Sequence, residues 1–323
     1  MPEVNEQNKN AMGGTELMAQ RIEAAIEPEL LEKFQIIHSR VRELQEDKHK
    51  ILVCHDLPQD PEVQHLKDEG WKKFDKLVFV SDWQQAMYQA YLGVPYSAGV
   101  VMRNAIEPIQ LTTKPGDKLR FIYHTTPHRG LDILYVVFDQ LTKEYDNLEL
   151  NVFSSFDLYG WESRDEKYKD LFKALEDHPN INYSKSVSNE QIREELARSH
   201  VFAYPSKWTE TSCLSLIEAM SAGCACVHSS LGALPETSMG MTFQYTFSED
   251  MQQHTNRFYT QMKDTIELYL EEDSQRLLEH RLSNAKMNAD RRYNMKLRSI
   301  EWNNLLEAIL TDKQKFDTVE SNQ

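Results

Sequence analysis

Residues 204–223, YPSKWTETSCLSLIEAMSAG, set the fold that this sequence predicts. The apolar run Val201–Tyr204 predicts a buried strand, which the Pro-Ser turn after it ends. A polar loop and a helix of small residues follow, and Gly223 ends that helix. A second buried strand, Cys224–Val227, comes directly afterwards. Strand, loop, helix and strand in this order form one right-handed crossover unit of a parallel sheet.

Two carboxylates lie in this unit, Glu210 in the loop and Glu218 in the helix. Ligands of open parallel sheets bind outside the carboxyl ends of the strands, so both residues are predicted to lie near a ligand. Glu218 falls in a run of Leu, Ile, Ala and Met, where an unpaired charge is costly. A buried ion pair with Arg or Lys would satisfy it, and so would the two hydroxyls of a ribose. Residue chemistry leaves both interpretations open.

The residues around these carboxylates form a longer pattern. Glu210-x7-Glu218 is preceded by Tyr-Pro-Ser at 204–206, followed by Glu-Ala-Met-x2-Gly at 218–223, and then by GALPE at 232–236. Together these segments resemble the signature of retaining glycosyltransferases of family 4, also called glycosyl transferases group 1. The resemblance implies the GT-B fold, an α/β architecture of two Rossmann-like, doubly wound domains that face each other across a cleft.

The composition suits two α/β domains. The chain has 323 residues, 40% of them apolar, and no run of about eighteen apolar residues that would indicate a membrane span. Its formal charge of −15 argues against strong nucleic-acid binding and against docking on anionic lipid. The first ten residues are polar and acidic, so we expect neither a signal peptide nor a transit peptide.

The four cysteines lie in or beside apolar runs, without the spacing of a zinc site or a redox pair. They are Cys54, Cys213, Cys224 and Cys226. Small buried residues are the expected role, and the pattern fits a reducing cytoplasm. We therefore expect a cytoplasmic protein with at most peripheral membrane contact.

Apolar runs alternate with helical stretches along the rest of the chain, which is the pattern of parallel sheets. Strands are predicted at Phe34–Ile37, Ile51–Cys54, Leu77–Val80, Val100–Met102, Leu119–Tyr123, Leu148–Phe153 and Met241–Phe243. A strand followed by a loop is predicted over 181–188, and Ser188 is expected to cap the helix that runs through Leu196. The segment KPGDK at 114–118 reads as a linker. With the resemblance, we expect a trimmed acceptor-side domain at 1–110 and a nucleotide-sugar-binding domain at 111–311. Helices at the end of the second domain should brace the first, and residues 312–323 should form a disordered tail.

A glycine loop precedes the first predicted helix, with Gly13 and Gly14 before Thr15 and Glu16. Its amide groups could bind an anion, or it could be an ordinary helix cap. In the family a similar loop faces the donor phosphates, so the resemblance assigns that role to Gly13 and Gly14. Family members carry a strand before this loop, whereas the preceding residues here are mostly polar and make a poor buried strand. We therefore expect a trimmed first sheet, in a minimal form or a fragment.

Three apolar runs of the first domain end in polar residues: HDLP at 55–58, SDW at 81–83 and RN at 103–104. These ends should meet at the ligand edge of the sheet. His55 could hydrogen-bond a hydroxyl or transfer a proton, or it could be a turn histidine bonded to backbone. The resemblance implies that His55 contacts the donor sugar. Ser81 and Asp82 are expected to cap a helix.

The second domain opens with a strand followed by the loop HTTPHRG at 124–130 and then a helix. Arg129 and amides at the helix start could hold a pyrophosphate, or Arg129 could be solvated. The resemblance implies phosphate binding by Arg129, although a second cation of the family pattern is replaced near Thr125. It also places Val187, Ser212, Cys213 and Leu214 among the donor-binding residues, with the loop at 184–187 against the nucleobase.

Taken together, the resemblance implies a retaining glycosyltransferase, of the hexosyltransferase type, with catalytic roles for Glu210, His55 and Arg129. Glu218 would hold the ribose. We expect no cofactor and no metal site, a UDP- or GDP-linked sugar as donor substrate, and a glycan or lipid-linked acceptor. Two alternatives stay open: a noncatalytic nucleotide-sugar-binding module, and a GT-B nucleotide-sugar epimerase or hydrolase.

Overall fold

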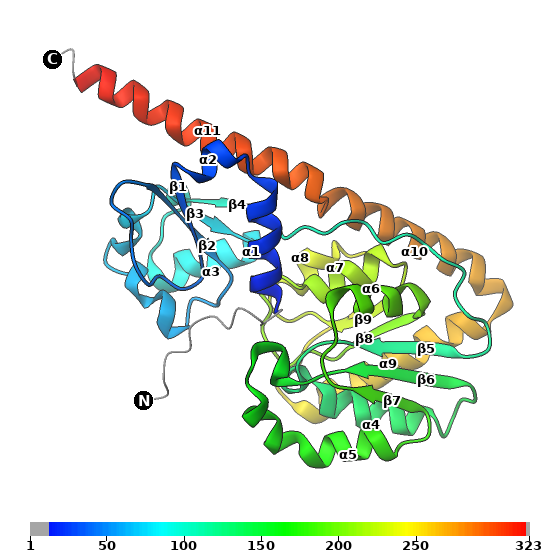
Figure 1. The fold of residues 1–323 in the computed structure, drawn as a ribbon. Coiled ribbons are helices and arrows are strands. Elements are labelled where there is room, and N and C mark those ends of the chain that lie inside the picture. The colour runs from blue at the N-terminus through cyan, green and yellow to red at the C-terminus, as the bar shows by residue number, and fades with distance from the viewer. Residues whose placement is uncertain (1–12, 321–323) are drawn as a thin grey trace. The chain divides into compact units, whose positions relative to one another are not determined.

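Parallel β-sheets with flanking helices make up both halves of the chain (Figure 1). The computed structural model describes residues 13–320, and for 313–320 it describes the backbone alone. The described chain divides into two units. The N-terminal unit comprises residues 14–106 and 293–320, and the C-terminal unit comprises Gly13 and residues 107–292. The chain thus leaves the first unit once and returns to it at its end.

The N-terminal unit contains a sheet of four parallel strands in chain order. They are β1 (Phe34–His38), β2 (His49–Cys54), β3 (Lys76–Phe79) and β4 (Gly99–Val101). Its helices are α1 (Gly14–Ala25), α2 (Pro28–Leu31) and α3 (Asp82–Leu92), with 3₁₀ turns η1 (Pro61–Leu66), η2 (Gly70–Lys73) and η3 (Tyr96–Ala98). The apolar runs predicted all four strands. Ser81 accepts a hydrogen bond from the Gln84 amide at 3.0 Å, which confirms the predicted cap of α3.

The last helix, α11 (Met295–Glu320), belongs to the N-terminal unit. Ser299 Oγ and Asn303 Nδ2 donate to the carbonyl of Ala25, at 2.6 and 3.1 Å, and Trp302 is 1% exposed. Residues 312–320, for which we expected a disordered tail, continue this helix. Lys and Gln, which recur there, are good helix formers, whereas that expectation rested on the polar composition and on the position of the segment at the end of the chain.

The C-terminal unit contains a six-stranded parallel sheet with the order β10-β9-β8-β5-β6-β7. The strands are β5 (Leu119–Tyr123), β6 (Leu148–Phe153), β7 (Ile181–Ser184), β8 (Val201–Tyr204), β9 (Ala225–Ser229) and β10 (Phe243–Tyr245). Numbered from β5, this is the 3-2-1-4-5-6 order of a doubly wound Rossmann sheet. The predicted strand at Met241–Phe243 lies two residues later in the structure, because Met241 and Thr242 precede the pairing of β10 with β9.

Helices cover both faces of this sheet (Figure 1). They are α4 (Leu131–Leu141), α5 (Lys169–Asp177), α6 (Asn189–Arg198), α7 (Leu214–Ser221), α8 (Leu234–Ser238), α9 (Met251–Leu270) and α10 (Glu272–Arg292), with the 3₁₀ turns η4 (Pro127–Arg129), η5 (Phe156–Tyr159) and η6 (Glu162–Tyr168). Ser188 forms a capping box with Gln191 at the start of α6, as predicted. The four cysteines are free thiols and buried.

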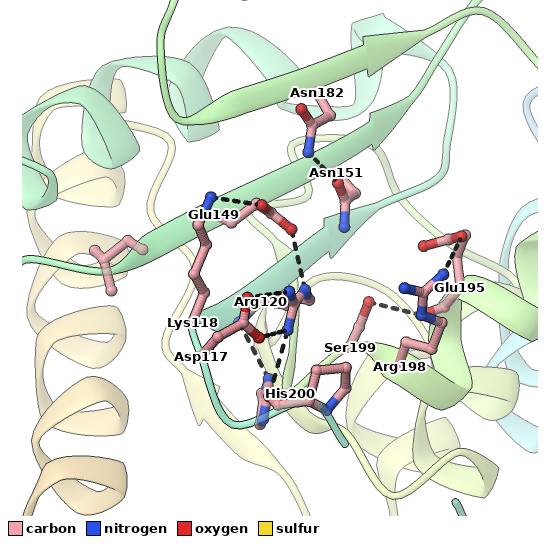
Figure 2. Close-up of polar contacts among 12 residues, drawn as sticks. Asp117, Lys118, Arg120, Glu149, Asn151, Asn182, Glu195, Arg198, Ser199 and His200 are labelled. Atoms are coloured by element: carbon pink, nitrogen blue, oxygen red, sulfur yellow. Dashed lines mark hydrogen bonds and ion pairs between the residues drawn. The ribbon is translucent and has the colours of Figure 1, made fainter. Parts of the chain in front are cut away.

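Charged residues join β5 and β6 at the amino end of the sheet (Figure 2). Arg120 on β5 donates from Nε to Glu149 on β6 at 3.0 Å, and from Nη1 and Nη2 to Asp117 at 2.8 and 2.9 Å. Lys118 reaches the other oxygen of Glu149 at 2.9 Å. Arg120 and Glu149 are cross-strand partners, so this network fixes the register at the end opposite to the ligand edge.

Candidate functional site

The strand order of the C-terminal sheet reverses between β5 and β8. Chain connections leave these two neighbouring strands in opposite directions, and ligands of such sheets bind in the crevice that results at their carboxyl ends. The loop after β5 carries Arg129, and the loop after β8 carries Glu210. The topology therefore brings together two residues that are 81 positions apart in the sequence.

Glu210 is a buried carboxylate with two partners. Arg129 Nη1 donates to Glu210 Oε1 and forms an ion pair with it. The hydroxyl of Tyr204, the last residue of β8, donates to the same oxygen at 2.5 Å. Glu210 is only 5% exposed and Tyr204 is fully buried. Because a buried charge is costly unless it is paired and hydrogen-bonded, these contacts explain how Glu210 stays in place.

Two glycines let the loops approach one another. Gly130, with φ +120°, caps η4, and a Cβ at this position would lie 2.2 Å from the carbonyl oxygen of Pro205. Gly232 has φ +62°, and its Cβ would lie 2.6 Å from the carbonyl oxygen of Glu210. The Ala233 amide donates to that same oxygen at 2.8 Å. A residue with a Cβ would be strained at the positive φ angle and would clash with the carbonyl oxygen, so glycine is needed at each turn.

Charges at this cluster are fixed by burial and by mutual contact. Burial alone would lower the pKa of Arg129, but Glu210 and then Tyr204 outweigh it, and the pKa is raised well above its usual value. Burial, and then the charge of Glu210, raises the pKa of Tyr204 well above its usual value. Arg129 is therefore a permanent cation, and Tyr204 is a neutral hydrogen-bond donor.

The β5–α4 loop carries buried polar atoms that have no hydrogen-bond partner within the described chain. They are His124 Nε2, Thr125 Oγ1, Thr126 Oγ1, His128 Nδ1 and Arg129 Nε. Burial lowers the pKa of His124 to about 3, and burial followed by the charge of Arg129 lowers the pKa of His128 to about 4. Both rings are thus neutral. Buried polar atoms are nearly always paired in folded proteins, so this concentration indicates a place for a polar ligand.

An aromatic group borders the same loop. The His128 ring stacks on Phe156 at 5.3 Å and meets the edge of Trp208 at 4.9 Å. Trp208 lies two residues before Glu210 and is 44% exposed. These residues were not predicted from the sequence, since no local pattern links the loops that carry them.

Glu218 lies on α7 and faces α6. Its two oxygens accept from Asn189 Nδ2 at 3.3 and 3.1 Å, and Arg193 Nη1 approaches Oε1 at 3.4 Å. Arg193 also donates to the carbonyl of Glu107 at 2.7 Å. With Glu218 only 2% exposed, the structure contains the buried ion pair that was one of the two interpretations left open. Asn189 and Arg193 were missed, although Asn189 directly follows the predicted cap residue of α6.

The other predicted donor-binding residues of the C-terminal unit lie on two loops at the carboxyl edge. Ser212, Cys213 and Leu214 lead into α7, where Cys213 occupies the N-cap position without a side-chain cap. Burial, and then the charge of Glu210, raises the pKa of the Cys213 thiol. Val187 is half-buried in the loop between β7 and α6. Their contact with a donor stays a prediction.

Within the N-terminal unit, His55 follows the end of β2 and lies beside His38, the last residue of β1. Its Nε2 is 3.3 Å from His38 Nδ1. His38 was missed, although an apolar strand ending in histidine is the same signal that singled out His55. Helix α1 begins at Gly14, as the glycine loop predicts, while residues 10–12 of that loop lie outside the described residues. Roles of His55, Gly13 and Gly14 toward a ligand stay predictions.

Comparison with known proteins identifies the fold. Residues 104–239, which include Arg129, Glu210 and Glu218, match the family model of glycosyl transferases group 1. No curated protein matches the sequence. Among the described residues, none of the helices has the length and hydrophobicity that a membrane span requires.

Several solved structures are similar. For a glycosyltransferase from Rickettsia africae ESF-5, the TM-score is 0.68 at 14% identity, covering 95% of this chain and 84% of that one. For the pneumococcal O-GlcNAc transferase GtfA, crystallised with UDP and GlcNAc, it is 0.63 at 14% identity, covering 91% and 60%. For Anabaena HepE, crystallised with UDP-glucose, it is 0.58 at 16% identity, covering 82% and 72%. The chain has the GT-B fold, as predicted.

Proposed function

We propose that this protein is a glycosyltransferase that moves a sugar from a nucleotide sugar to a hydroxyl acceptor with retention of anomeric configuration. One observation carries the proposal: Arg129 and Glu210 meet at the switch point of the C-terminal sheet, in the part of the chain that matches glycosyl transferases group 1. A permanent cation and a buried carboxylate at a ligand edge suit a substrate with a charged diphosphate and a neutral sugar.

Arg129 acts on the diphosphate. One nitrogen of its guanidinium, Nη1, donates to Glu210, while Nε is buried without a partner in the described chain. Phosphate oxygens are the ligands that an oriented guanidinium binds best, and its charge would stabilise the negative charge that develops on the leaving group. Thr126 Oγ1 and the neutral His128 add hydrogen-bonding groups on the same loop.

The two glutamates bind hydroxyls. Glu210 Oε1 takes the contacts from Arg129 and Tyr204, so its second oxygen is oriented to accept from hydroxyls of the donor sugar. Glu218 accepts from the two ribose hydroxyls, with Asn189 and Arg193 holding its carboxylate in place. We propose a UDP- or GDP-linked hexose, and the structures of GtfA with UDP and of HepE with UDP-glucose favour uridine.

The chemistry needs no nucleophile from the protein. The acceptor oxygen attacks the anomeric carbon from the face that the diphosphate leaves, so a C–O bond to the acceptor forms as the C–O bond to phosphate breaks. The departing phosphate oxygen takes the acceptor proton. We propose that the reaction uses no cofactor and no metal, with Arg129 supplying the positive charge, and that the acceptor is a glycan or a lipid-linked saccharide.

The experiment is product analysis by NMR. The full chain is incubated with UDP-glucose, UDP-GlcNAc and GDP-mannose and with glycan and lipid-linked acceptors. An α-linked product from an α-linked donor, lost in Glu210→Gln but kept in the exposed control Glu194→Gln on α6, is the expected result. A β-linked product would refute retention. Free sugar alone would indicate a hydrolase, a rearranged nucleotide sugar an epimerase, and binding without turnover a noncatalytic module.

A further inference from the structure

Two histidines meet at the carboxyl edge of the N-terminal sheet. His38 ends β1 and His55 follows β2, and these strands are parallel neighbours in the register His38↔Val53. The rings stack with centroids 5.6 Å apart and an interplanar angle of 24°. His38 Nδ1 lies 3.3 Å from His55 Nε2, which is the distance of a hydrogen bond.

Both rings are neutral near pH 7. Burial lowers the pKa of His38 to about 4, and burial followed by His38 itself lowers the pKa of His55 to about 3. Between two neutral imidazoles, one nitrogen donates and the other accepts. If His55 carries its hydrogen on Nε2, His38 Nδ1 must be the unprotonated acceptor, and His38 then carries its hydrogen on Nε2. In the reverse case, both carry it on Nδ1. The two rings therefore share one tautomer.

Packing alone does not explain why position 38 carries a histidine. His38 is 8% exposed, and its second ring nitrogen, Nε2, is buried without a partner in the described chain. Glu16 on α1 has a carboxylate oxygen in the same condition. A phenyl ring would stack as well as His38 without leaving a polar atom unsatisfied, so the cost of that atom has to be offset by what Nδ1 does for His55.

We propose that His38 is a positioning residue for His55. Its hydrogen bond fixes the tautomer and the ring plane of His55, and so decides whether His55 presents a donor or an acceptor to a sugar hydroxyl. The inference rests on the proposed function for the presence of that hydroxyl, but the coupling of the two rings does not.

The coupling is tested first, by long-range ¹H–¹⁵N spectra of the histidine-labelled full chain at pH 7. His55→Gln assigns the His55 signals. His38→Phe keeps the stacked ring and removes the hydrogen bond, whereas His38→Asn keeps an amide near the position of Nδ1. Wild type should show His38 and His55 in the same single tautomer, and His38→Phe should shift the His55 signals toward a mixture of tautomers that His38→Asn does not show. Opposite tautomers, or His55 signals unchanged in His38→Phe, would overturn the proposal.

Turnover is measured next on the same variants. His38→Phe should lower kcat about tenfold, the effect of losing one hydrogen bond, with the donor KM nearly unchanged and recovery in His38→Asn. Coupled tautomers with no transferase activity in wild type would refute the proposed function and leave the pair standing. An active wild type with an equally active His38→Phe would overturn the positioning role.

Discussion

Tyr204 and Glu210 are joined by a hydrogen bond of 2.5 Å between the phenol hydroxyl and Oε1, and both side chains are buried. The tyrosine lies at the end of β8 and the glutamate in the loop that follows, so the bond ties the loop to the rigid sheet. Arg129 reaches the same oxygen from the neighbouring strand's loop. Glu210 is thus oriented from both sides of the switch point.

Removing this hydroxyl should affect chemistry more than folding. In Tyr204→Phe, the ring stays packed while Glu210 keeps only Arg129. A hydrogen bond to a charged group contributes about 1.5–3 kcal/mol, so we expect kcat/KM to fall by about tenfold to a hundredfold. Steady-state kinetics with the preferred donor measures the loss. A variant with unchanged kcat/KM would show that Tyr204 does not orient Glu210.

A substitution at Gly232 tests whether its turn must lie close to the loop that carries Glu210. Gly232→Ala introduces a Cβ 2.6 Å from the Glu210 carbonyl oxygen, at φ +62°. The matched control is Gly240→Ala, where φ is +70° and nothing lies within 4 Å of the added atom. The left-handed backbone costs both variants about 1–2 kcal/mol, so the clash alone separates them. Chemical denaturation should show a larger loss of stability in Gly232→Ala, together with lost turnover. Equal losses would mean that the loop shifts freely.

The charged network at the amino end of the sheet should support stability without affecting turnover (Figure 2). Arg120 and Glu149 have side chains that are 12% and 16% exposed. Arg120→Met leaves Glu149 with Lys118 alone, so we expect a loss of about 1–3 kcal/mol in the free energy of unfolding. Lys118 is 42% exposed, and Lys118→Met should cost less than about 1 kcal/mol. A change in kcat for either variant would contradict the assignment of the site to the opposite edge.

Buried neutral histidines should make the fold labile in acid. His228 is fully buried, with Nδ1 2.8 Å from the Ser229 carbonyl oxygen and Nε2 2.7 Å from Thr242 Oγ1, and burial lowers its pKa from 6.5 to about 4. The unfolded chain therefore binds more protons than the folded one between these values. Stability should be fully present above pH 6.5, fall as the pH drops toward 4, and change no further through this group below that.

Denaturation at a series of pH values measures that slope. In His228→Asn, the slope between pH 6.5 and 4 should decrease by about one proton, because the group that takes it up is gone. The other histidines with a lowered pKa, such as His124, account for the slope that remains in the variant. An identical slope in the variant would mean that the pKa of His228 is not lowered in the folded protein.

Local sequence predicted the strands and the placement of the loops. Runs such as Val201–Tyr204 are apolar on both faces, which only a sheet covered by helices requires, and Gly223 marks where α7 must end. The predicted cap at Ser188 follows from side-chain chemistry within one turn of helix. These features depend on neighbours a few residues apart, and for that reason the sequence alone was sufficient.

Long-range partners could not be predicted in the same way. Residue chemistry showed that Glu218 needs a partner but not that Arg193, 25 positions earlier, supplies it. Arg129 and Glu210 were both singled out, yet their contact depends on β5 and β8 being neighbours in the sheet. His38 carried the same local signal as His55, but its pairing with His55 across two strands could not be predicted from that signal. Such contacts are set by strand order, which a single sequence does not specify.

The most direct test of the donor site is thermal stabilisation by UDP, GDP, ADP and their common sugar conjugates, for wild type, Arg129→Ala and Glu218→Ala. A ligand that binds only the folded state raises Tm as its concentration exceeds Kd. We predict that one nucleotide raises Tm in wild type, more so as its sugar conjugate, and that both variants lose the gain while the exposed control Arg291→Ala on α10 keeps it. No shift with any nucleotide, or an equal shift in all variants, would contradict a donor site built on Arg129 and Glu218.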